Sequence, residues 1–283
     1  MRFVRGNHKG QHILCVEAAG LLRGQVIETR QSDLLEAALE IGPAGLTALG
    51  QSLANGAVFD VEAINFLPPL PRPPKTVCVG LNYRDHTEES GYDQPDFPTF
   101  FARFPSSFIG HNAPMIEPAG SATLDFEGEL AVVIGKPGRH IAKDRAHDHI
   151  AGFSVFNDGS VREYQFKAPQ WMPGKNFDGT GAFGPSLVTA DELPAGAKGL
   201  KIETRLNGKV VQSSNTDALV FSIAEIIAHL SEAMTLQTGD VIVSGTPSGI
   251  GHARDPKLYM RDGDVCEVTI EGLGTLRNPI VRQ

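Results

Sequence analysis

The sequence predicts a β-rich α+β fold, with a small N-terminal α+β domain over residues 1–70 before a larger β-rich domain over residues 71–283. Three observations support it: β-forming runs recur along the chain, turn signals separate them, and helix-forming runs are few. The boundary falls at residues 67–76, which hold five of the 19 prolines. Proline fixes φ and lacks a backbone donor, so this stretch is expected to be an extended connector.

The N-terminal residues are expected to form an accessory domain without chemistry of its own. Two β-type runs, at residues 2–4 and 12–18, precede an apolar-periodic stretch at residues 33–41 that predicts a helix. A second helix is expected after the Gly42-Pro43 break.

Strand signals dominate after the connector. Asn207-Gly208 suits a type I′ turn and predicts a hairpin of residues 200–206 and 209–213. A second hairpin is predicted at 265–271 and 275–281, with further strands at 129–134, 152–156 and 240–244. One helix is well specified, because Ser222 and Glu225 have the spacing of a capping box. The apolar face expected to pack on the sheet consists of Ile223, Ile226, Ile227, Leu230 and Met234.

Composition argues against several classes of partner. The chain has 33 Asp and Glu against 25 Lys and Arg, a net charge of -8, whereas binding to nucleic acid needs clustered cations. The longest apolar runs are far shorter than the roughly 18 residues that a membrane helix needs. Neither a signal-peptide pattern nor a cysteine framework is present, so we expect a cytoplasmic protein with no membrane or nucleic-acid partner.

Acidic residues gather at the start of one predicted strand. Side chains of a strand alternate between faces, so Asp125, Glu127 and Glu129 are expected to point the same way. A solvated face is the commoner reason for such a triplet. The strand continues with Leu-Ala-Val-Val-Ile, however, which indicates that the carboxylates point into the protein.

Another carboxylate, Asp158, follows the predicted strand at 152–156. Asn157-Asp158-Gly159 also suits a plain turn, which stays an alternative. If Asp158 meets Glu127 and Glu129, the three form an all-oxygen site for Mg²⁺, Mn²⁺ or Ca²⁺ rather than Zn²⁺. Water and substrate oxygens would complete the coordination, so the metal would act as template and Lewis acid.

Two further sets of residues suit catalysis. If a helix follows residues 77–80, His86 and Glu89 lie on one helical face, where the carboxylate would orient a basic imidazole for activating water. An ordinary surface pair is an equally open explanation. Lys175 lies in a glycine-flanked loop without the spacing of a phosphate loop. Lys175 either binds an oxyanion or carboxylate or is an ordinary solvated lysine.

The order and spacing of these motifs resemble one family, the fumarylacetoacetate hydrolase family. The matching stretches, from about residue 78 to residue 281, are GLNYRDHTEE, LDFEGELAVVIGK, FNDGSVREYQ, GKNFDGTGAFGP, SGTPSGIG and CEVTIEGLGTLRNPIV. The resemblance implies a mixed β-roll, β-sandwich-like catalytic domain that forms a homodimer. It also implies a divalent metal, Mg²⁺ first, on Glu127, Glu129 and Asp158.

The resemblance assigns further roles. It implies a catalytic set of His86, Glu89 and Lys175, and substrate-contacting positions at Arg103, Gln165 and Thr246. The helix around His86 acts in relatives as a lid, a role that residues 87–96 suit. The chain departs from the family at Gly159-Ser160-Val161-Arg162-Glu163, where relatives often have Val-Ser-Ala-Arg-Asp, and at Arg103, where many have lysine. These departures concern substrate specificity and leave the metal site untouched.

Together these features predict a catabolic, metal-dependent hydrolase that cleaves a carbon–carbon bond in a 2,4-diketo acid such as an acylpyruvate or fumarylpyruvate. His86 would activate water, and Lys175 and Gln165 would stabilise the oxyanion. The alternatives are an oxaloacetate decarboxylase or tautomerase that uses the same metal site. A different class, a non-catalytic assembly protein stabilised by metal, also stays open.

Overall fold

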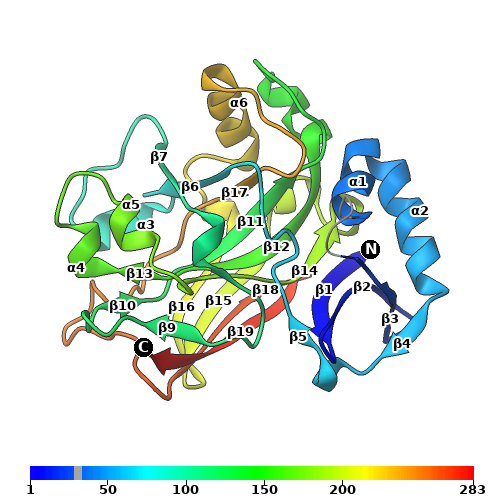
Figure 1. Cartoon of the computed structure of the whole chain (residues 1–283). Coiled ribbons are helices and arrows are strands. Elements are labelled where there is room, and N and C mark those ends of the chain that lie inside the picture. Colours follow the sequence, from blue (N-terminus) through cyan, green and yellow to red (C-terminus); the bar gives the residue numbers. More distant parts are fainter. Residues whose placement is uncertain (29–33) are drawn as a thin grey trace.

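The largest sheet crosses the whole molecule in the computed structural model, which describes residues 1–28 and 34–283 (Figure 1). Within those residues it has twelve strands, ten of them in the order β4-β3-β2-β1-β14-β12-β11-β17-β6-β7, with β5 paired to β1 and β8 to β14. Their bounds are β1 Arg2–His8, β2 Gln11–Ala18, β3 Leu21–Val26, β4 Ala57–Phe59, β5 Asn65–Phe66, β6 Thr76–Gly80, β7 Thr99–Ala102, β8 Phe108–Ile109, β11 Gly128–Ile134, β12 Ile150–Asp158, β14 Gly181–Thr189 and β17 Val241–Val243.

A second sheet packs against one face of the first and contains both predicted hairpins. In the described part of the chain its order is β16-β15-β18-β19-β9, and a two-stranded sheet pairs β10 with β13. Asn207 and Gly208 have φ values of 52° and 77°, as a type I′ turn requires. The strands are β9 Met115–Glu117, β10 Leu124–Asp125, β13 Ser160–Val161, β15 Lys201–Leu206, β16 Lys209–Asn215, β18 Val265–Ile270 and β19 Gly274–Arg282.

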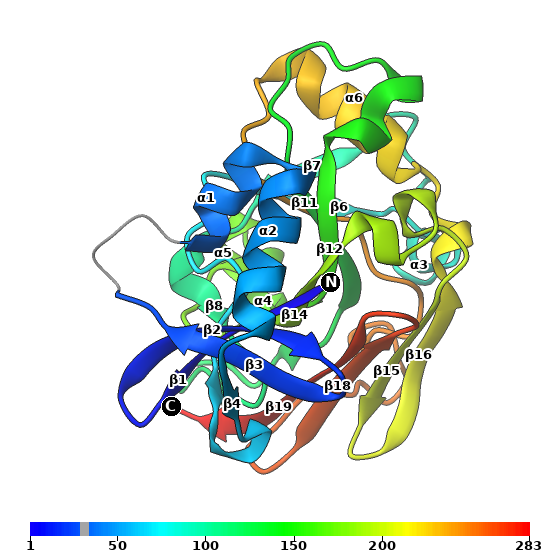
Figure 2. The same cartoon turned by 90° about the vertical axis from the view of Figure 1, so that its right-hand side faces the viewer.

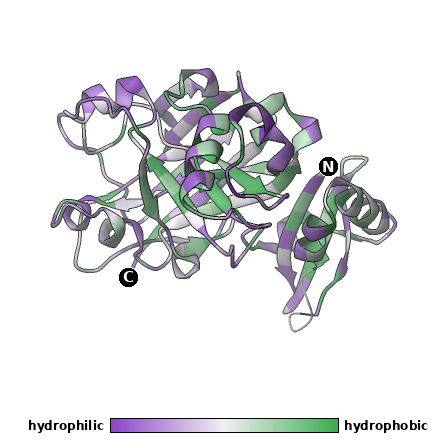
Figure 3. Cartoon of the chain, turned by 90° about the horizontal axis from the view of Figure 1, so that it is seen from above, coloured by the Kyte–Doolittle hydropathy of each residue, from purple (hydrophilic) through white to green (hydrophobic). Residues whose placement is uncertain are grey.

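Strands β11 and β12 lie between two cores, which explains their continuous apolar sequences. Leu130 and Val132 of β11 face a core shared with the second sheet, whereas Ala131 and Val133 face a core shared with the N-terminal helices. A strand buried on both faces has no need of polar alternation. Figure 3 shows apolar residues along these inner strands and polar residues on the outer helices and loops.

The N-terminal residues extend the large sheet. Strand β1 pairs with β14, so that Arg2 lies opposite Val188, and the sheet crosses the division expected at residue 70. Helices α1 (Leu34–Ile41) and α2 (Pro43–Ala54) cover the same side of this sheet (Figure 2) and share a core with β11. The predicted first helix is confirmed from Leu34 onward, and residue 33 lies outside the described residues. The division into two domains stays a prediction.

Helix α6 (Ile223–Ala233) begins as the sequence predicts. The Ser222 hydroxyl accepts from the backbone N–H of Glu225, and the Glu225 carboxylate accepts from the backbone N–H of Ser222. Its apolar face is buried, although the helix ends one residue before Met234. None of the helices in the described part of the chain is long and apolar enough to cross a membrane. The cytoplasmic location stays a prediction.

Three short helices gather at one edge of the large sheet, on the side away from α1 and α2 (Figure 1). They are α3 (Arg84–Glu89), α4 (Arg162–Gln165) and α5 (Met172–Lys175). Strands β6, β12 and β17 end on this side of the sheet and β11 begins there, because the other three strands run antiparallel to β11.

The 3-10 helices are η1 Val61–Ala63, η2 Pro105–Ser107, η3 Lys143–His149, η4 Ala190–Glu192, η5 Ala195–Ala197 and η6 Thr216–Ala218.

Candidate metal centre and active-site cavity

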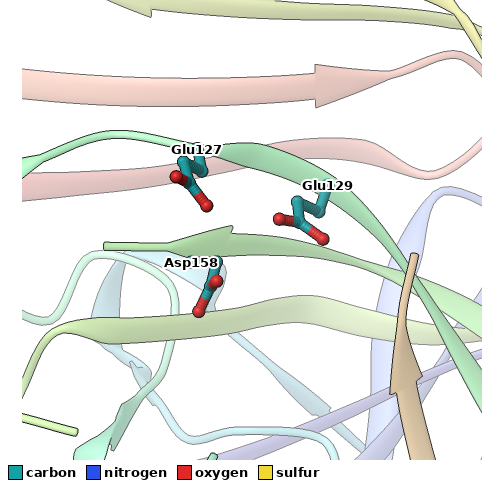
Figure 4. A group of neighbouring side chains, drawn as sticks. All are labelled: Glu127, Glu129 and Asp158. Atoms are coloured by element: carbon teal, nitrogen blue, oxygen red, sulfur yellow. The ribbon is translucent and has the colours of Figure 1, made fainter. Parts of the chain in front are cut away.

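Three carboxylates meet at the edge where β11 begins and β12 ends (Figure 4). Glu127 precedes β11, Glu129 lies in it, and Asp158 is the last residue of β12. The Asp158 backbone N–H donates to the Glu127 carbonyl at 2.9 Å, so the two residues lie opposite each other in the antiparallel pair. One oxygen from each carboxylate lies within 4.8 Å of the others, and all three residues are buried. The predicted triad is therefore present as a geometric unit.

The triad fits a divalent cation. Its donors are all carboxylate oxygens, which Mg²⁺, Mn²⁺ and Ca²⁺ prefer. Burial, followed by the charges of Asp158 and Glu127, raises the pKa of Glu129 well above its ordinary value. Both causes oppose a negative charge on Glu129 while the site holds no cation beyond its side chains. A bound divalent ion would offset it, and Glu127, Glu129 and Asp158 would hold the ion.

Lys175 lies directly beside this triad. Its Nζ donates to Glu127 Oε2 at 2.6 Å and to Asp158 Oδ2 at 2.7 Å. Burial opposes the charge of the ammonium group, but Asp158 and Glu127 outweigh it and raise the pKa of Lys175. The residue closes the short helix α5 and is only 2% exposed, so the solvated loop lysine considered from the sequence is wrong. Lys175 is a fixed positive charge at the metal site.

Arg103 differs from its sequence-based prediction. Its guanidinium donates to Asp158 Oδ1, to Thr180 Oγ1 at 2.7 Å and to Ser107 Oγ at 3.1 Å. The residue is 1% exposed and is absent from the residues that line the cavity. A Cβ at Gly181 would lie 2.6 Å from Arg103 Nε, so this glycine makes room for the arginine. Arg103 pairs with Asp158 without lining the cavity, and its position gives no support to the expected substrate contact.

Asp125 also differs from its prediction, because its carboxylate leaves the face of Glu127 and Glu129. It accepts from Arg162 Nε at 2.9 Å and from the backbone N–H groups of Gly251 and His252 at 2.8 Å each. The chain leaves β10 at Asp125 and enters β11 only at Gly128, so strand alternation does not hold between them. Asp125 therefore pairs with an arginine instead of joining the triad.

That arginine, Arg162, is a site residue that sequence reasoning missed. Its Nη1 lies 2.6 Å from Glu127 Oε1 and donates to Gln165 Oε1 at 2.8 Å. It is 2% exposed and lines the cavity. The sequence did contain a signal, because Arg162 follows Asp158 by four residues. It lies in the stretch of residues 159–163, whose differences from the family were related only to substrate specificity.

The charges around the triad suit an anionic ligand once a metal is bound. Three buried cations face four buried carboxyl groups, and with every group counted as ionised the formal sum is one net negative charge: Arg103, Arg162 and Lys175 against Asp125, Glu127, Glu129 and Asp158. A divalent ion would turn this into one net positive charge. The negative net charge of the whole chain is therefore no argument against an anionic ligand at this site.

The predicted pair on α3 forms and faces the same cavity. His86 Nδ1 and Glu89 Oε1 lie 2.9 Å apart, and Glu89 Oε2 accepts from the backbone N–H of Gly249 at 2.8 Å. His86 is 7% exposed, which argues against a surface pair. Burial raises the pKa of Glu127, but the charges of Lys175, Arg162 and then His86 outweigh burial and lower this pKa to about 2. His86 and Glu89 line the same cavity as Glu127 and Glu129.

One cavity of about 460 Å³ connects these groups. Gln165 lines it, and within the described residues no partner occupies its amide nitrogen. Thr246 also lines it, but its hydroxyl donates to the Gly128 carbonyl at 3.0 Å and accepts from Gln212 at 2.8 Å. Apolar residues complete the wall, among them Val79, Leu81, Phe101, Trp171 and Ile250. The cavity therefore offers a charged end and an apolar wall.

Comparison with known proteins gives a consistent result. The family model for the fumarylacetoacetate (FAA) hydrolase C-terminal region matches residues 75–281. The chain is 43% identical over 246 residues to the mitochondrial oxaloacetate tautomerase FAHD2A of Homo sapiens, covering 86% of this chain and 78% of that protein. The corresponding Xenopus laevis tautomerase, fahd2, is 39% identical over 246 residues, covering 86% of this chain and 77% of that protein.

Solved structures agree with this match. A fumarylacetoacetate hydrolase from Exiguobacterium antarcticum superposes with a TM-score of 0.87 at 33% identity, covering 100% of both chains. A 2-hydroxyhepta-2,4-diene-1,7-dioate isomerase from Mycobacterium marinum superposes with a TM-score of 0.79 at 30% identity, covering 100% of this chain and 99% of that one. The β-rich fold predicted from the sequence is therefore confirmed.

Proposed function

Because the chain belongs to the fumarylacetoacetate hydrolase family, we propose that it is a metal-dependent enzyme that interconverts the keto and enol forms of a 2-keto acid. Oxaloacetate is the first substrate to test, since the curated relatives named above are oxaloacetate tautomerases. The observation that carries the proposal is one cavity lined by two carboxylates of the triad, Glu127 and Glu129, together with Lys175 and the His86–Glu89 pair. The keto-acid partner is part of this proposal, and the homodimer stays a prediction.

The residues of the charged end divide the chemistry between them. A divalent ion, when bound, would supply a Lewis acid that polarises the 2-keto oxygen. Lys175 brings a fixed positive charge 2.6 Å from the nearest triad oxygen, where it favours an enolate over the neutral ketone. Glu127, Glu129 and Lys175 are themselves buried, so their charges are less screened by water than charges at the surface.

His86 is the group placed to move the proton. Glu89 contacts Nδ1 and thereby leaves Nε2 for the substrate. In the enol direction, Nε2 would take a proton from C3, which leaves an enolate. The enolate oxygen would then take up this proton. The reverse sequence gives the ketone. Glu89 is held in turn by the backbone N–H of Gly249, so the imidazole is oriented before substrate binds.

A second candidate is the carbon–carbon hydrolase of 2,4-diketo acids expected from the sequence. The observation that favours it is the same His86–Glu89 pair, which also suits activation of water. Product analysis separates the reactions: a hydrolase releases a second acid, a decarboxylase releases CO₂, and a tautomerase releases neither and only speeds the equilibration of the keto and enol forms. A non-catalytic assembly protein would bind metal and consume none of these acids.

The first experiment follows ketonisation of enol-oxaloacetate by its ultraviolet absorbance, with Mg²⁺ or Mn²⁺ present. The wild type should accelerate it, and His86→Ala should lower kcat by about 100-fold, the usual contribution of a general acid–base residue. His147→Ala, an exposed histidine on η3, serves as the matched control and should keep full activity. Undiminished turnover by His86→Ala would remove this residue from the mechanism.

A further inference from the structure

The outer end of the cavity holds a histidine that the proposed chemistry does not use. His252 lines the cavity, and its Nδ1 lies 2.7 Å from the hydroxyl of Tyr259. Its ring packs against Phe166, with 5.1 Å between the ring centroids. Phe166 is 46% exposed, so the pair lies at the mouth of the cavity.

The place of His252 is fixed relative to the metal end. Glu127 of the triad contacts Arg162, and Arg162 pairs with Asp125. Asp125 in turn accepts from the backbone N–H of His252 at 2.8 Å. In this chain of contacts Arg162 and Asp125 separate His252 from Glu127, and both Glu127 and His252 line the same cavity. A ligand whose keto-acid end lies at the triad therefore shares its cavity with His252.

The hydrogen bond to Tyr259 decides which nitrogen of the His252 imidazole is the donor. A phenol is a better donor than acceptor, and an unprotonated imidazole nitrogen is a good acceptor, so the Tyr259 hydroxyl donates to Nδ1. Burial and then Asp125 raise the pKa of Tyr259, which keeps the phenol protonated. Burial, followed by Lys257 and Arg162, lowers the pKa of His252, which keeps the ring neutral. The proton of the neutral ring therefore lies on Nε2.

The arginine and the lysine that line the cavity in the described part of the chain already pair with carboxylates. Arg162 contacts Asp125, Glu127 and Gln165, and Lys175 contacts two triad carboxylates. His252 Nε2, by contrast, has no hydrogen-bond partner among the residues that the structure describes. The cavity volume of about 460 Å³ lies within the usual range of small-molecule sites, which leaves room for acids longer than oxaloacetate.

We propose that His252 determines specificity: its Nε2–H donates a hydrogen bond to a second carboxylate at the far end of a 2-keto diacid. Tyr259 is a positioning residue that fixes this donor. The inference rests on the proposed function, because that function places the keto-acid end at the triad. The enzyme accordingly prefers keto diacids over monoacids of the same length.

The test measures enolisation of a matched panel by deuterium exchange at C3 in D₂O with Mg²⁺, read by NMR. The diacids are oxaloacetate, 2-oxoglutarate and 2-oxoadipate, and the monoacids are 2-oxobutyrate, 2-oxopentanoate and 2-oxohexanoate. His252→Ala should lower kcat/KM at least tenfold for a diacid that the wild type prefers and less than twofold for its matched monoacid, since a hydrogen bond to a charged group is lost. His252→Gln keeps an N–H donor and should recover most of the preference. Tyr259→Phe should lower the ratio of kcat/KM for the diacid to kcat/KM for its matched monoacid, by about threefold.

Equal losses for diacids and monoacids in His252→Ala, or no loss for any diacid, would overturn the proposal. If the wild type exchanges none of the acids, the proposed function fails, and binding then decides the specificity separately. Trp171, the single tryptophan of the chain, lines the cavity, so its fluorescence reports binding of the same acids with Mg²⁺. A diacid preference that His252→Ala abolishes would support the inference. Equal affinities in wild type, or no binding of either class, would contradict it.

Discussion

At the scale of single residues, buried cations compensate the charge of the triad. Arg103 pairs with Asp158, and Lys175 bridges Asp158 and Glu127. Both cations are almost fully buried, so neither can be hydrated if its partner is lost. Removing one partner of such a pair leaves an uncompensated buried charge.

Arg103→Met is therefore expected to destabilise the metal-free protein by about 3–5 kcal/mol, as urea unfolding would measure. Arg145→Met is the matched control, because Arg145 is 69% exposed and its pair with Asp148 should contribute little. A variant that keeps wild-type stability but raises KM for keto acids would show that Arg103 contacts substrate after all.

Part of the site was predictable because its residues are close together in the sequence. The i, i+3 pair of His86 and Glu89 follows from helix geometry, and Glu127 and Glu129 lie two residues apart at the start of β11. Their meeting with Asp158 depends on the pairing of β11 with β12. The direction of Asp125 was not predictable, because the strand breaks between Asp125 and Gly128. The role of Arg162 depends on contacts that join residues far apart in the chain, such as its pair with Asp125.

At the scale of elements, α6 shows how a local signal fixes a helix start. Ser222 and Glu225 satisfy each other's backbone N–H groups, and the apolar face behind them is buried. Both predicted hairpins formed as well, since their turns are set by glycine and asparagine at positive φ. Elements with such local signals could be predicted, whereas short helices that depend on tertiary contacts, such as α5, could not.

Ser222→Ala should destabilise the protein by about 1 kcal/mol in urea unfolding, because the first turn of α6 loses its capping side chain. Ser213→Ala, an exposed serine on β16, is the control and should be neutral. Catalysis should not change in either variant. Identical unfolding midpoints for Ser222→Ala and wild type would contradict this account of the helix start.

At the scale of the whole molecule, the N-terminal residues and the larger part share one sheet. Arg2 pairs with Val188, and a common core packs against the sheet there. The division at residue 70 expected from the sequence does not predict this continuity. Pairing across so long a separation leaves no local pattern to read. Phe66 of β5 and His111 of the larger part meet at the same junction, with 4.9 Å between their rings.

His111 should make this junction sensitive to acid. Burial and then Arg277 lower its pKa from 6.5 to about 4, so the folded state keeps it neutral. The unfolded chain binds the proton first, so stability is lost as pH falls from about 6.5 towards 4. Because His111 is only half-buried, the loss is about 1–2 kcal/mol.

His111→Asn, which cannot ionise but can still accept from the backbone N–H of Arg277, should remove this part of the pH dependence. The measurement compares urea unfolding of wild type and variant at pH 7 and near pH 4.5. A parallel loss of stability in both proteins would exclude His111 as the cause.

The central claim is that Glu127, Glu129 and Asp158 hold a divalent ion on which enolisation of a keto acid depends. The most direct measurement titrates chelated protein with Mg²⁺ by calorimetry and follows enol-oxaloacetate ketonisation at each point. Wild type should regain activity in proportion to bound metal, and Glu129→Gln should lower metal affinity at least tenfold. Glu232→Gln, an exposed control, should match wild type. Full activity in chelated wild type, or unchanged metal binding in Glu129→Gln, would contradict the account.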